Sequence, residues 1–184
     1  MIKKIETERL ELRLADLSDA PIVMSIFNDW EIIKWFQPPL VWPCNKKESY
    51  IYFRKMLAKK NVFLFMINIK NSDKDVGVIR YKLLYNGDFV YAERGFALSK
   101  NYWNKGIISE ASFAGNCFFF ENTEIEEIVT YNSVENKVSS KVQKNQGFKL
   151  EGIREAYSPY NTGCTSEEIW VLTQKQHKKI TKKN

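Results

Sequence analysis

The chain has 184 residues, of which 44% are hydrophobic, 28 are basic and 22 are acidic. This length and composition suit one domain with a sizeable core, and they exclude intrinsic disorder, a collagen-like chain and a disulfide scaffold. The net charge of +6 falls to +1 without the five lysines of the last ten residues, which include no acidic side chain. We therefore expect one near-neutral domain, residues 1–174, and a solvated basic tail, residues 175–184, which argues against nucleic acid as a partner.

Membrane insertion, secretion and several common catalytic centres are also excluded by the sequence. No stretch reaches the ~18 apolar residues of a membrane span, and the first residues lack the apolar segment of a signal peptide, so a cytoplasmic location is expected. The three cysteines are far apart, and the only histidine, His177, lies in the expected tail. Neither a metal cluster nor a Ser-His or Cys-His triad can form within one chain. Carboxylates, hydroxyls, backbone amides or a bound cofactor must therefore carry the chemistry.

Hydrophobic periodicity and turn residues predict a mixed sheet flanked by helices. In chain order, the predicted elements are a strand at 9–14, helices at 19–28 and 46–59, strands at 62–67, 76–84 and 89–98, a helix at 107–121, a strand at 126–132, a helix at 136–145, a strand from Phe148 and a last strand at 167–173. The segment Trp30–Pro43, rich in tryptophan and proline, is predicted to be a loop with at most one helical turn. Strands 62–67, 76–84 and 89–98 are expected to form an antiparallel meander.

A candidate phosphate site follows the third strand of this meander. The segment Tyr102–Ala111 reads YWNKGIISEA and opens an apolar helix after a loop with a single glycine, Gly106. Unpaired backbone N–H groups and the positive end of the helix dipole make such a helix start suitable for phosphate or pyrophosphate, and Lys105 adds a positive charge. The alternative is a plain connection between strand and helix. Neither GxxxxGK[ST] nor GxGxxG is present, which excludes a P-loop NTPase and a dinucleotide-binding Rossmann fold.

Three ordered motifs resemble those of the GNAT family of N-acetyltransferases. Residues 92–98 (AERGFAL) and 102–111 are similar to its acyl-CoA-binding segment, which often reads AEIGYxL…YWGKGxxTEA. Residues 136–152 are similar to its second motif, NxxSxxV…GFxxEG. Residues 7–13 (TERLELR) resemble the first strand of the branch that contains the ribosomal-protein N-terminal acetyltransferases. The resemblance covers residues 7–173 and implies the acyl-CoA N-acyltransferase fold. This is an α/β (α+β) fold with a mixed, mostly antiparallel seven-stranded sheet, splayed central strands and about four helices.

The resemblance also implies acetyl-CoA as co-substrate, without a metal. Pantetheine is expected in the gap beside the splayed strand, and the pyrophosphate at the start of the following helix. The residues that the resemblance places at acetyl-CoA are Phe96, Ala97, Leu98, Trp103, Asn104, Lys105, Gly106, Ile107, Ile108, Ser109, Asn136 and Lys141. Two of them depart from the wider family, which has Gln or Arg at Trp103 and Gly or Ala at Ile108. Lys141 shares a helix face with Lys137 and Lys144, which could attract the 3′-phosphate or could simply be solvated.

Glu93 and Ser139 are the candidate catalytic residues. Glu93 matches the Glu of AEIG and could act as general base through one water, or it could be a strand residue in a salt bridge. Ser139 matches a serine that could protonate the leaving thiolate, or its hydroxyl could bond to the helix backbone. The alternative acids are Tyr131, Tyr157 and Tyr160. An amide of a bulged strand, near Ala97 or Leu98, is expected to hold the oxyanion.

The acceptor site is expected near Trp30 and Trp35, with Phe36 and Trp42 in the same segment. These aromatic rings could contact a cationic amine, or they could close the core beneath the loop. The expected function is transfer of an acetyl group from acetyl-CoA to a primary amine, by direct attack in a ternary complex. The amine could belong to a protein N-terminus, a polyamine, an aminoglycoside or an amino-sugar, and the protein could be a monomer or a homodimer. The alternative function is a catalytically silent acyl-CoA-binding module or sensor.

Overall fold

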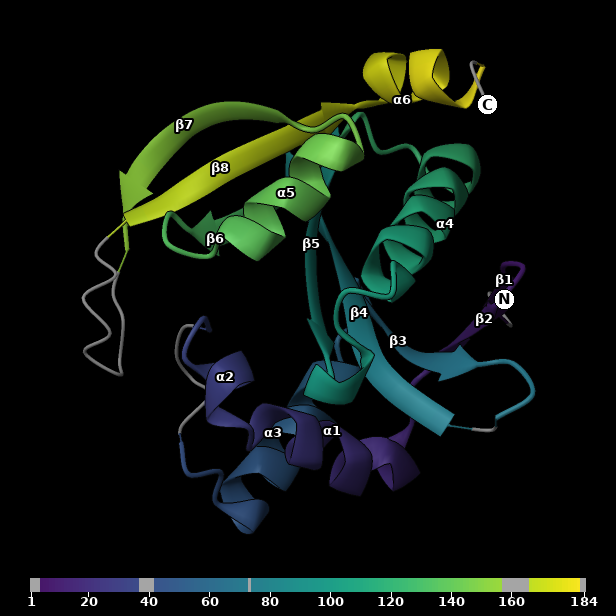
Figure 1. Ribbon diagram of the computed structural model, residues 1–184. Coiled ribbons are helices and arrows are strands. Elements are labelled where there is room, and N and C mark those ends of the chain that lie inside the picture. Colours follow the sequence, from purple (N-terminus) through teal and green to yellow (C-terminus); the bar gives the residue numbers. More distant parts are fainter. Residues whose placement is uncertain (1–3, 37–41, 73, 157–165, 183–184) are drawn as a thin grey trace.

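A computed structural model describes residues 4–36, 42–72, 74–156 and 166–182 (Figure 1). Within these residues, eight strands form one sheet in the order β1-β2-β3-β4-β5-β6-β8-β7. The strands are β1 (Lys4–Glu6), β2 (Leu10–Leu14), β3 (Val62–Ile69), β4 (Lys74–Asn86), β5 (Phe89–Leu98), β6 (Glu127–Ser133), β7 (Lys149–Glu155) and β8 (Ser166–Thr173). The meander of β3, β4 and β5 is confirmed, since each neighbour in it pairs antiparallel.

In the described part of the chain, six α-helices lie on the two faces and at one end of the sheet (Figure 1). They are α1 (Ala20–Phe27), α2 (Trp30–Ile33), α3 (Lys46–Leu57), α4 (Ile107–Asn122), α5 (Lys137–Asn145) and α6 (Gln174–Thr181). Alternation along β3 divides the core: Phe65 and Ile67 pack with α4, whereas Leu64 and Met66 pack with α1 to α3. Helices α1 to α3 therefore cover one face, and α4 and α5 cover the other. No helix in the described ranges is long and apolar enough to cross a membrane.

The two central strands, β5 and β6, are the only parallel pair in the described sheet, and they separate partway along their length. Their pairing covers three positions, from Tyr91 opposite Glu127 to Glu93 opposite Val129. Both strands continue past this point, β5 to Leu98 and β6 to Ser133. Backbone groups along the inner edge of the gap are thus left out of the β5–β6 ladder. The predicted splay of the central strands is confirmed.

The observed elements differ from the prediction at the start of the chain and in the loop before α3. Strand β1 was not predicted, because three residues are too few to show a period, and it brings the sheet to eight strands instead of seven. The predicted loop does contain one helical turn, α2, which the side chain of Asp29 caps by accepting a hydrogen bond from the amide of Glu31. Residues 37–41 of this loop lie outside the described ranges.

Residues 175–181 of the expected tail lie in helix α6, which spans Gln174–Thr181. Thr173 caps this helix in a capping box with Gln176. His177 is buried, with its ring centroid 5.0 Å from that of Phe120, and Ile180 lies against Gly147, where an added Cβ would come within 2.2 Å of it. The lysines of this helix, Lys175, Lys178 and Lys179, are exposed as expected. The side chains of His177 and Ile180, three residues apart, therefore attach this helix to the rest of the domain, although its composition is mostly polar.

Protonation of His177 is expected to destabilise the fold. Burial lowers the pKa of His177 below its ordinary value of 6.5, although the charge of Glu121 acts in the opposite direction. The folded state then binds fewer protons than the unfolded state, so stability falls as the pH drops below 6.5 towards the folded pKa. We expect the Tm to fall between about pH 7 and pH 5, and to fall less in His177→Phe, whose ring cannot be protonated. Equal falls in the two proteins, measured by thermal denaturation, would contradict this.

Candidate functional site

The loop before α4 has the backbone geometry of an anion site. Asn104 and Gly106 both adopt left-handed conformations, with φ of 60° and 73°. Gly106 is the N-cap of α4, and no side chain caps the helix start. The first N–H groups of a helix have no intrahelical partner, so those of Ile107, Ile108 and Ser109 remain for a ligand. The bulk of Ile108 does not obstruct this arrangement, because its side chain is buried in the core.

An ion pair that the sequence analysis did not identify holds this loop in place. The Nε and Nη2 atoms of Arg9 each lie 2.6 Å from Oε2 of Glu110, and its Nη1 donates to the carbonyl of Lys105 at 3.1 Å. The same carboxylate accepts hydrogen bonds from the Thr7 hydroxyl and the Arg9 amide. Arg9 and Glu110 belong to two of the motifs quoted above. The presence of both motifs in the sequence was the available signal for this ion pair. Residues 7–9 and the start of α4 therefore form one unit.

The charge of Glu110 is compensated within this unit. Partial burial acts to raise the pKa of Glu110, but hydrogen bonds from Thr7 and Arg9 and the positive charge of Arg9 outweigh burial and lower it. Glu110 is therefore an ionised carboxylate whose partner is Arg9. Since the Arg9 guanidinium offsets it, the negative charge in the first turn of α4 does not oppose a bound phosphate.

The end of β5 pairs regularly with β4 and is also hydrogen-bonded to the loop that follows it. Its pairing with β4 runs from Phe89 to Leu98 without a shift in register, so the bulge expected near Ala97 is absent from this ladder. The indole N–H of Trp103 donates to the carbonyl of Leu98 at 2.7 Å. A Cβ on Gly77 would lie 2.6 Å from the carbonyl oxygen of Ala97, so β4 needs glycine there. Trp103 thus contacts the strand end that the sequence analysis assigned to pantetheine, while Phe96 is half-buried beside it.

Helix α5 begins beside the gap between β5 and β6. The side chain of Asn136 caps the helix by accepting a hydrogen bond from the amide of Ser139 at 3.1 Å. Ser139 is buried, and its Oγ lies 3.3 Å from Nε2 of Gln143. Lys141 is exposed, as are its neighbours on the same helix face, Lys137 and Lys144. The structure therefore brings Asn136 and Ser139 together at the helix start and leaves the lysine face in solvent.

Glu93 and Tyr131 lie on the opposite face of the sheet from Ser139. The carboxylate of Glu93 forms an ion pair with Arg80, and the Glu93 side chain is 25% exposed. A strand residue in a salt bridge was the alternative to a general base in the sequence analysis. Burial raises the pKa of the Tyr131 hydroxyl, the Arg154 charge opposes this rise and the Glu93 charge adds to it. The Arg154 guanidinium lies 3.9 Å from the centre of the Tyr131 ring. Tyr157 and Tyr160 lie outside the described ranges.

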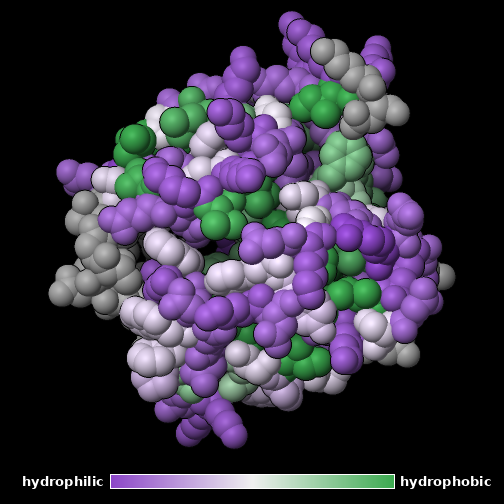
Figure 2. Space-filling view, viewed as in Figure 1, coloured by the Kyte–Doolittle hydropathy of each residue, from purple (hydrophilic) through white to green (hydrophobic). Residues whose placement is uncertain are grey.

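The molecular surface has a hollow on one side (Figure 2). Figure 2 shows this hollow near the middle of the face viewed, in the area between α5 and α2 in Figure 1. Because neighbouring residues of a strand point to opposite faces, Glu93 points away from α4 and α5, which its neighbour Arg94 contacts. A ligand in the gap between β5 and β6 would therefore have Ser139 on one side and Glu93 on the other.

The aromatic residues of the predicted acceptor site contact protein groups. The rings of Trp30 and Trp42 lie 5.0 Å apart, and the indole N–H of Trp42 donates to the carbonyl of Asn28. The ammonium of Lys34 lies 5.0 Å from the centre of the Trp35 ring. Both tryptophans of the prediction are half-buried. They close the surface around α2, and each of them remains partly exposed.

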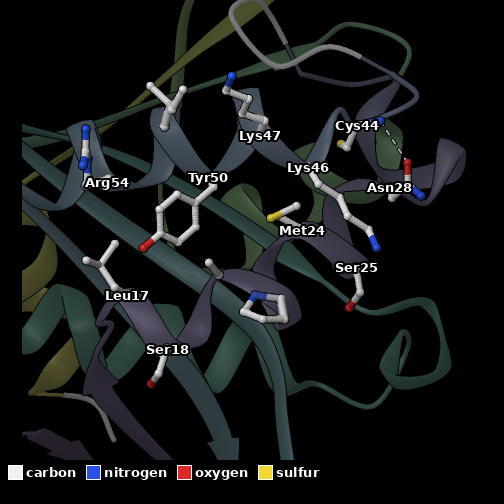
Figure 3. Close-up of a pocket in the computed structure, with 13 residues that line it drawn as sticks. Leu17, Ser18, Met24, Ser25, Asn28, Cys44, Lys46, Lys47, Tyr50 and Arg54 are labelled. Carbon is white, nitrogen blue, oxygen red and sulfur yellow. Dashed lines mark hydrogen bonds between the residues drawn. The ribbon is translucent and has the colours of Figure 1, made fainter.

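A separate pocket of about 920 Å³ lies between α1 and α3. In Figure 3, the side chains of Met24 and Tyr50 point into the space between these helices. Its basic lining residues are Lys46, Lys47 and Arg54, and its lining includes no residue of the loop before α4 or of the gap between β5 and β6. It is therefore distinct from the candidate site. Across the described ranges, no group of His, Cys, Asp and Glu side chains could hold a metal ion.

Comparison with known proteins agrees with this geometry. A family model described as an acetyltransferase (GNAT) domain matches residues 9–149. The chain is 26% identical over 159 residues to the uncharacterized N-acetyltransferase p20 of Bacillus licheniformis, which covers 85% of this chain and 88% of that protein. A GNAT-family acetyltransferase from Bacillus anthracis superposes with a TM-score of 0.79 and 23% identity, covering 94% of this chain and 99% of the other. RimL, a ribosomal L7/L12 alpha-N-protein acetyltransferase solved with coenzyme A, superposes with a TM-score of 0.79 and 19% identity, covering 93% and 98%.

Proposed function

The chain belongs to the GNAT family of acetyltransferases, and we propose that it transfers the acetyl group of acetyl-CoA to a primary amine by direct attack in a ternary complex. Acetyl-CoA is its co-substrate. The observation that carries the proposal is the separation of β5 from β6 after Glu93, directly beside the uncapped start of α4. Such a gap admits an extended thioester arm, and the helix start accepts its diphosphate.

We assign acetyl-CoA to the loop before α4 and to the gap. The diphosphate would bind the amides of residues 104–109, with Lys105 adding charge, and pantetheine would run along residues 96–98. Asn136 would contact the arm from the start of α5, and Lys141 would attract the 3′-phosphate. This assignment is supported by the left-handed conformation of Gly106 and by the exposure of Lys141.

We assign Glu93 as general base and Ser139 as the acid for the leaving thiolate. The amine would approach from the face that carries Glu93, which would take its proton directly or through one water. The thiolate would leave on the face that carries α5, where Ser139 would protonate its sulfur. The positions of the two side chains on opposite faces support this division, since the nitrogen and the sulfur are different substituents of the tetrahedral carbon and each can be served by its own group. Tyr131 is the alternative acid, and it lies on the face that carries Glu93.

The acceptor is expected to bind beside Trp30 and Trp35. Partly exposed aromatic rings can contact a cationic amine and the chain that carries it. A protein N-terminus is the first acceptor to test, because RimL acts on one and shares the fold. Small amines remain the alternative class.

An acceptor panel tests this proposal. Thiol release from acetyl-CoA would be measured with peptides that have free N-termini, and with a polyamine, an aminoglycoside and an amino-sugar, each product being identified by mass. We expect acceptor-dependent release with at least one primary amine. Release that is the same with and without every acceptor would contradict amine acetylation.

Loss of the Arg9–Glu110 ion pair is expected to weaken CoA binding. In Arg9→Gln the loop loses its bond to the Lys105 carbonyl and Glu110 loses its partner, so a negative charge faces the diphosphate. A partly exposed pair contributes up to about 1 kcal/mol, which corresponds to about a fivefold rise in the Kd for CoA by titration calorimetry. Lys4→Gln is the control, because it removes exposed ion pairs with Glu6 and Glu11 that do not contact the loop. An unchanged Kd in Arg9→Gln would refute the role given to this pair.

A further inference from the structure

Arg94 is a buried cation without a carboxylate partner among the described residues. Its side chain is 1% exposed and points from β5 towards α4 and α5. Its Nη1 lies 3.1 Å from Oδ1 of Asn116 and 3.2 Å from Oε1 of Gln146, and its Nη2 donates to Oε1 of Gln143. The Phe148 ring centre lies 4.5 Å from its Cζ. Burying a charge beside neutral amides is costly, and the family motif quoted above has isoleucine at this position, so a plain packing role does not explain the arginine.

The guanidinium fixes which way the Gln143 amide points. Arginine only donates hydrogen bonds, so the amide oxygen of Gln143 must face Arg94 and the amide nitrogen must point away. That nitrogen, Nε2, lies 3.3 Å from Oγ of Ser139 and donates to it. The Ser139 oxygen therefore acts as an acceptor towards the helix interior. Among the described residues, no acceptor is found for the Ser139 hydroxyl proton, which is left to donate elsewhere.

We propose that Arg94 is a positioning residue that, through Gln143, holds the Ser139 hydroxyl ready to donate its proton to the sulfur of the leaving coenzyme A. The inference rests on the proposed role of Ser139. In this step the C–S bond of the tetrahedral intermediate breaks and its electron pair goes to the sulfur, while the Ser139 O–H bond breaks and an S–H bond forms on coenzyme A. The hydrogen bond that Nε2 of Gln143 donates stabilises the negative charge that develops on the Ser139 oxygen. Glu93 releases to bulk water the proton that it took from the amine. Ser139 then regains a proton from bulk water.

Gln143→Glu tests the orientation directly, because it keeps the side-chain shape while reversing one hydrogen bond. A carboxylate still pairs with Arg94, so the variant is expected to fold with a Tm no lower than that of the wild type. Towards Ser139 this carboxylate can only accept a hydrogen bond. It therefore competes with the sulfur of coenzyme A for the proton of the Ser139 hydroxyl. We expect the single-turnover rate to fall about 10- to 100-fold, with the Kd for acetyl-CoA unchanged within about twofold. Gln146→Glu places the same charge beside Arg94 without contacting Ser139, and its rate should stay within about twofold of wild type.

The leaving group separates a role in proton donation from a structural role. A selenol is a stronger acid than a thiol, so acetyl-selenocoenzyme A needs little proton donation when it leaves. The losses in Gln143→Glu and in Ser139→Ala should therefore both shrink with the selenoester. An unchanged rate in Ser139→Ala with acetyl-CoA would refute the proposed role of Ser139. A loss in Ser139→Ala but not in Gln143→Glu, or an equal loss in Gln143→Glu with both donors, would overturn the inference about Arg94.

A neutral variant keeps the test decisive if the charged one does not fold. Gln143→Met removes the donor to Ser139 without adding charge, and its effect can be measured alone and in the Ser139→Ala background. Because both changes act on the same proton, the loss in the double variant should equal that of Ser139→Ala alone. Losses that add would mean that Gln143 acts independently of Ser139, which would contradict the proposal.

Discussion

Glu93→Gln is expected to lower kcat by about two to four orders of magnitude, because the amide cannot accept the proton of the attacking amine. The substitution preserves side-chain size, and its amide oxygen can still accept from Arg80, so the local arrangement of β4 and β5 should be kept. The Kd for acetyl-CoA should change little, since Glu93 lies on the face opposite α4 and α5. Steady-state kinetics with the best acceptor of the panel, combined with calorimetric titration of acetyl-CoA, would measure both quantities.

Glu11→Gln is the matched control for this substitution. Glu11 is also a strand glutamate in an ion pair, with Lys4, but it lies on β2. Its kcat should equal that of the wild type. If Glu93→Gln turned over as fast as the wild type, Glu93 would not be the base.

Gly106→Val is expected to raise the Kd for CoA about 10- to 100-fold. A β-branched residue strongly disfavours the left-handed conformation that Gly106 adopts, with φ of 73°, and such strain costs about 1–3 kcal/mol. A side chain there would also approach Nη2 of Arg9, which lies 3.5 Å from the Cβ position. The loop would relieve the strain by moving, and the amides of the first turn of α4 would lose their alignment with the diphosphate. Calorimetric titration of CoA measures the change directly.

Gly87→Val separates the loss of binding from the cost of backbone strain. Gly87 also has a positive φ, 61°, in the turn between β4 and β5, and a Cβ there meets nothing within 4 Å. Both variants should lose thermal stability, but only Gly106→Val should lose CoA affinity. For the wild type, CoA at 100 times its Kd should raise the free energy of unfolding by about 2.7 kcal/mol. An unchanged Kd in Gly106→Val would place the diphosphate elsewhere.

The order of strands and helices could be predicted because the period of hydrophobic residues changes clearly along the chain. The continuous apolar run at 62–67 and the turns before 76–84 and 89–98 predicted the meander without further information. The separation of β5 from β6 could not be derived from periodicity, because the pattern of a single strand does not show where its pairing with a neighbouring strand stops. Only the resemblance of motifs implied it. Helix α6 was missed because two inward residues, His177 and Ile180, are too few to produce a visible pattern.

Charged residues account for most of what the sequence did not predict about the site. Arg9 and Glu110 are far apart in sequence, and their pairing depends on where β2 and α4 meet in space. Arg94 contradicts the usual rule that charged side chains are exposed, and its partners are amides on α4, on α5 and at the C-cap of α5. Nothing local to residues 92–98 indicates those partners. Such polar networks depend on tertiary packing, which the period of a single strand or helix does not encode.

Direct attack in a ternary complex is tested most directly by initial rates of thiol release. These rates would be measured while acetyl-CoA and the best acceptor of the panel are varied together. The account predicts double-reciprocal plots that intersect, and no release of coenzyme A before the acceptor is added. Parallel plots together with a burst of thiol release in the absence of acceptor would show an acetylated enzyme, and would contradict it.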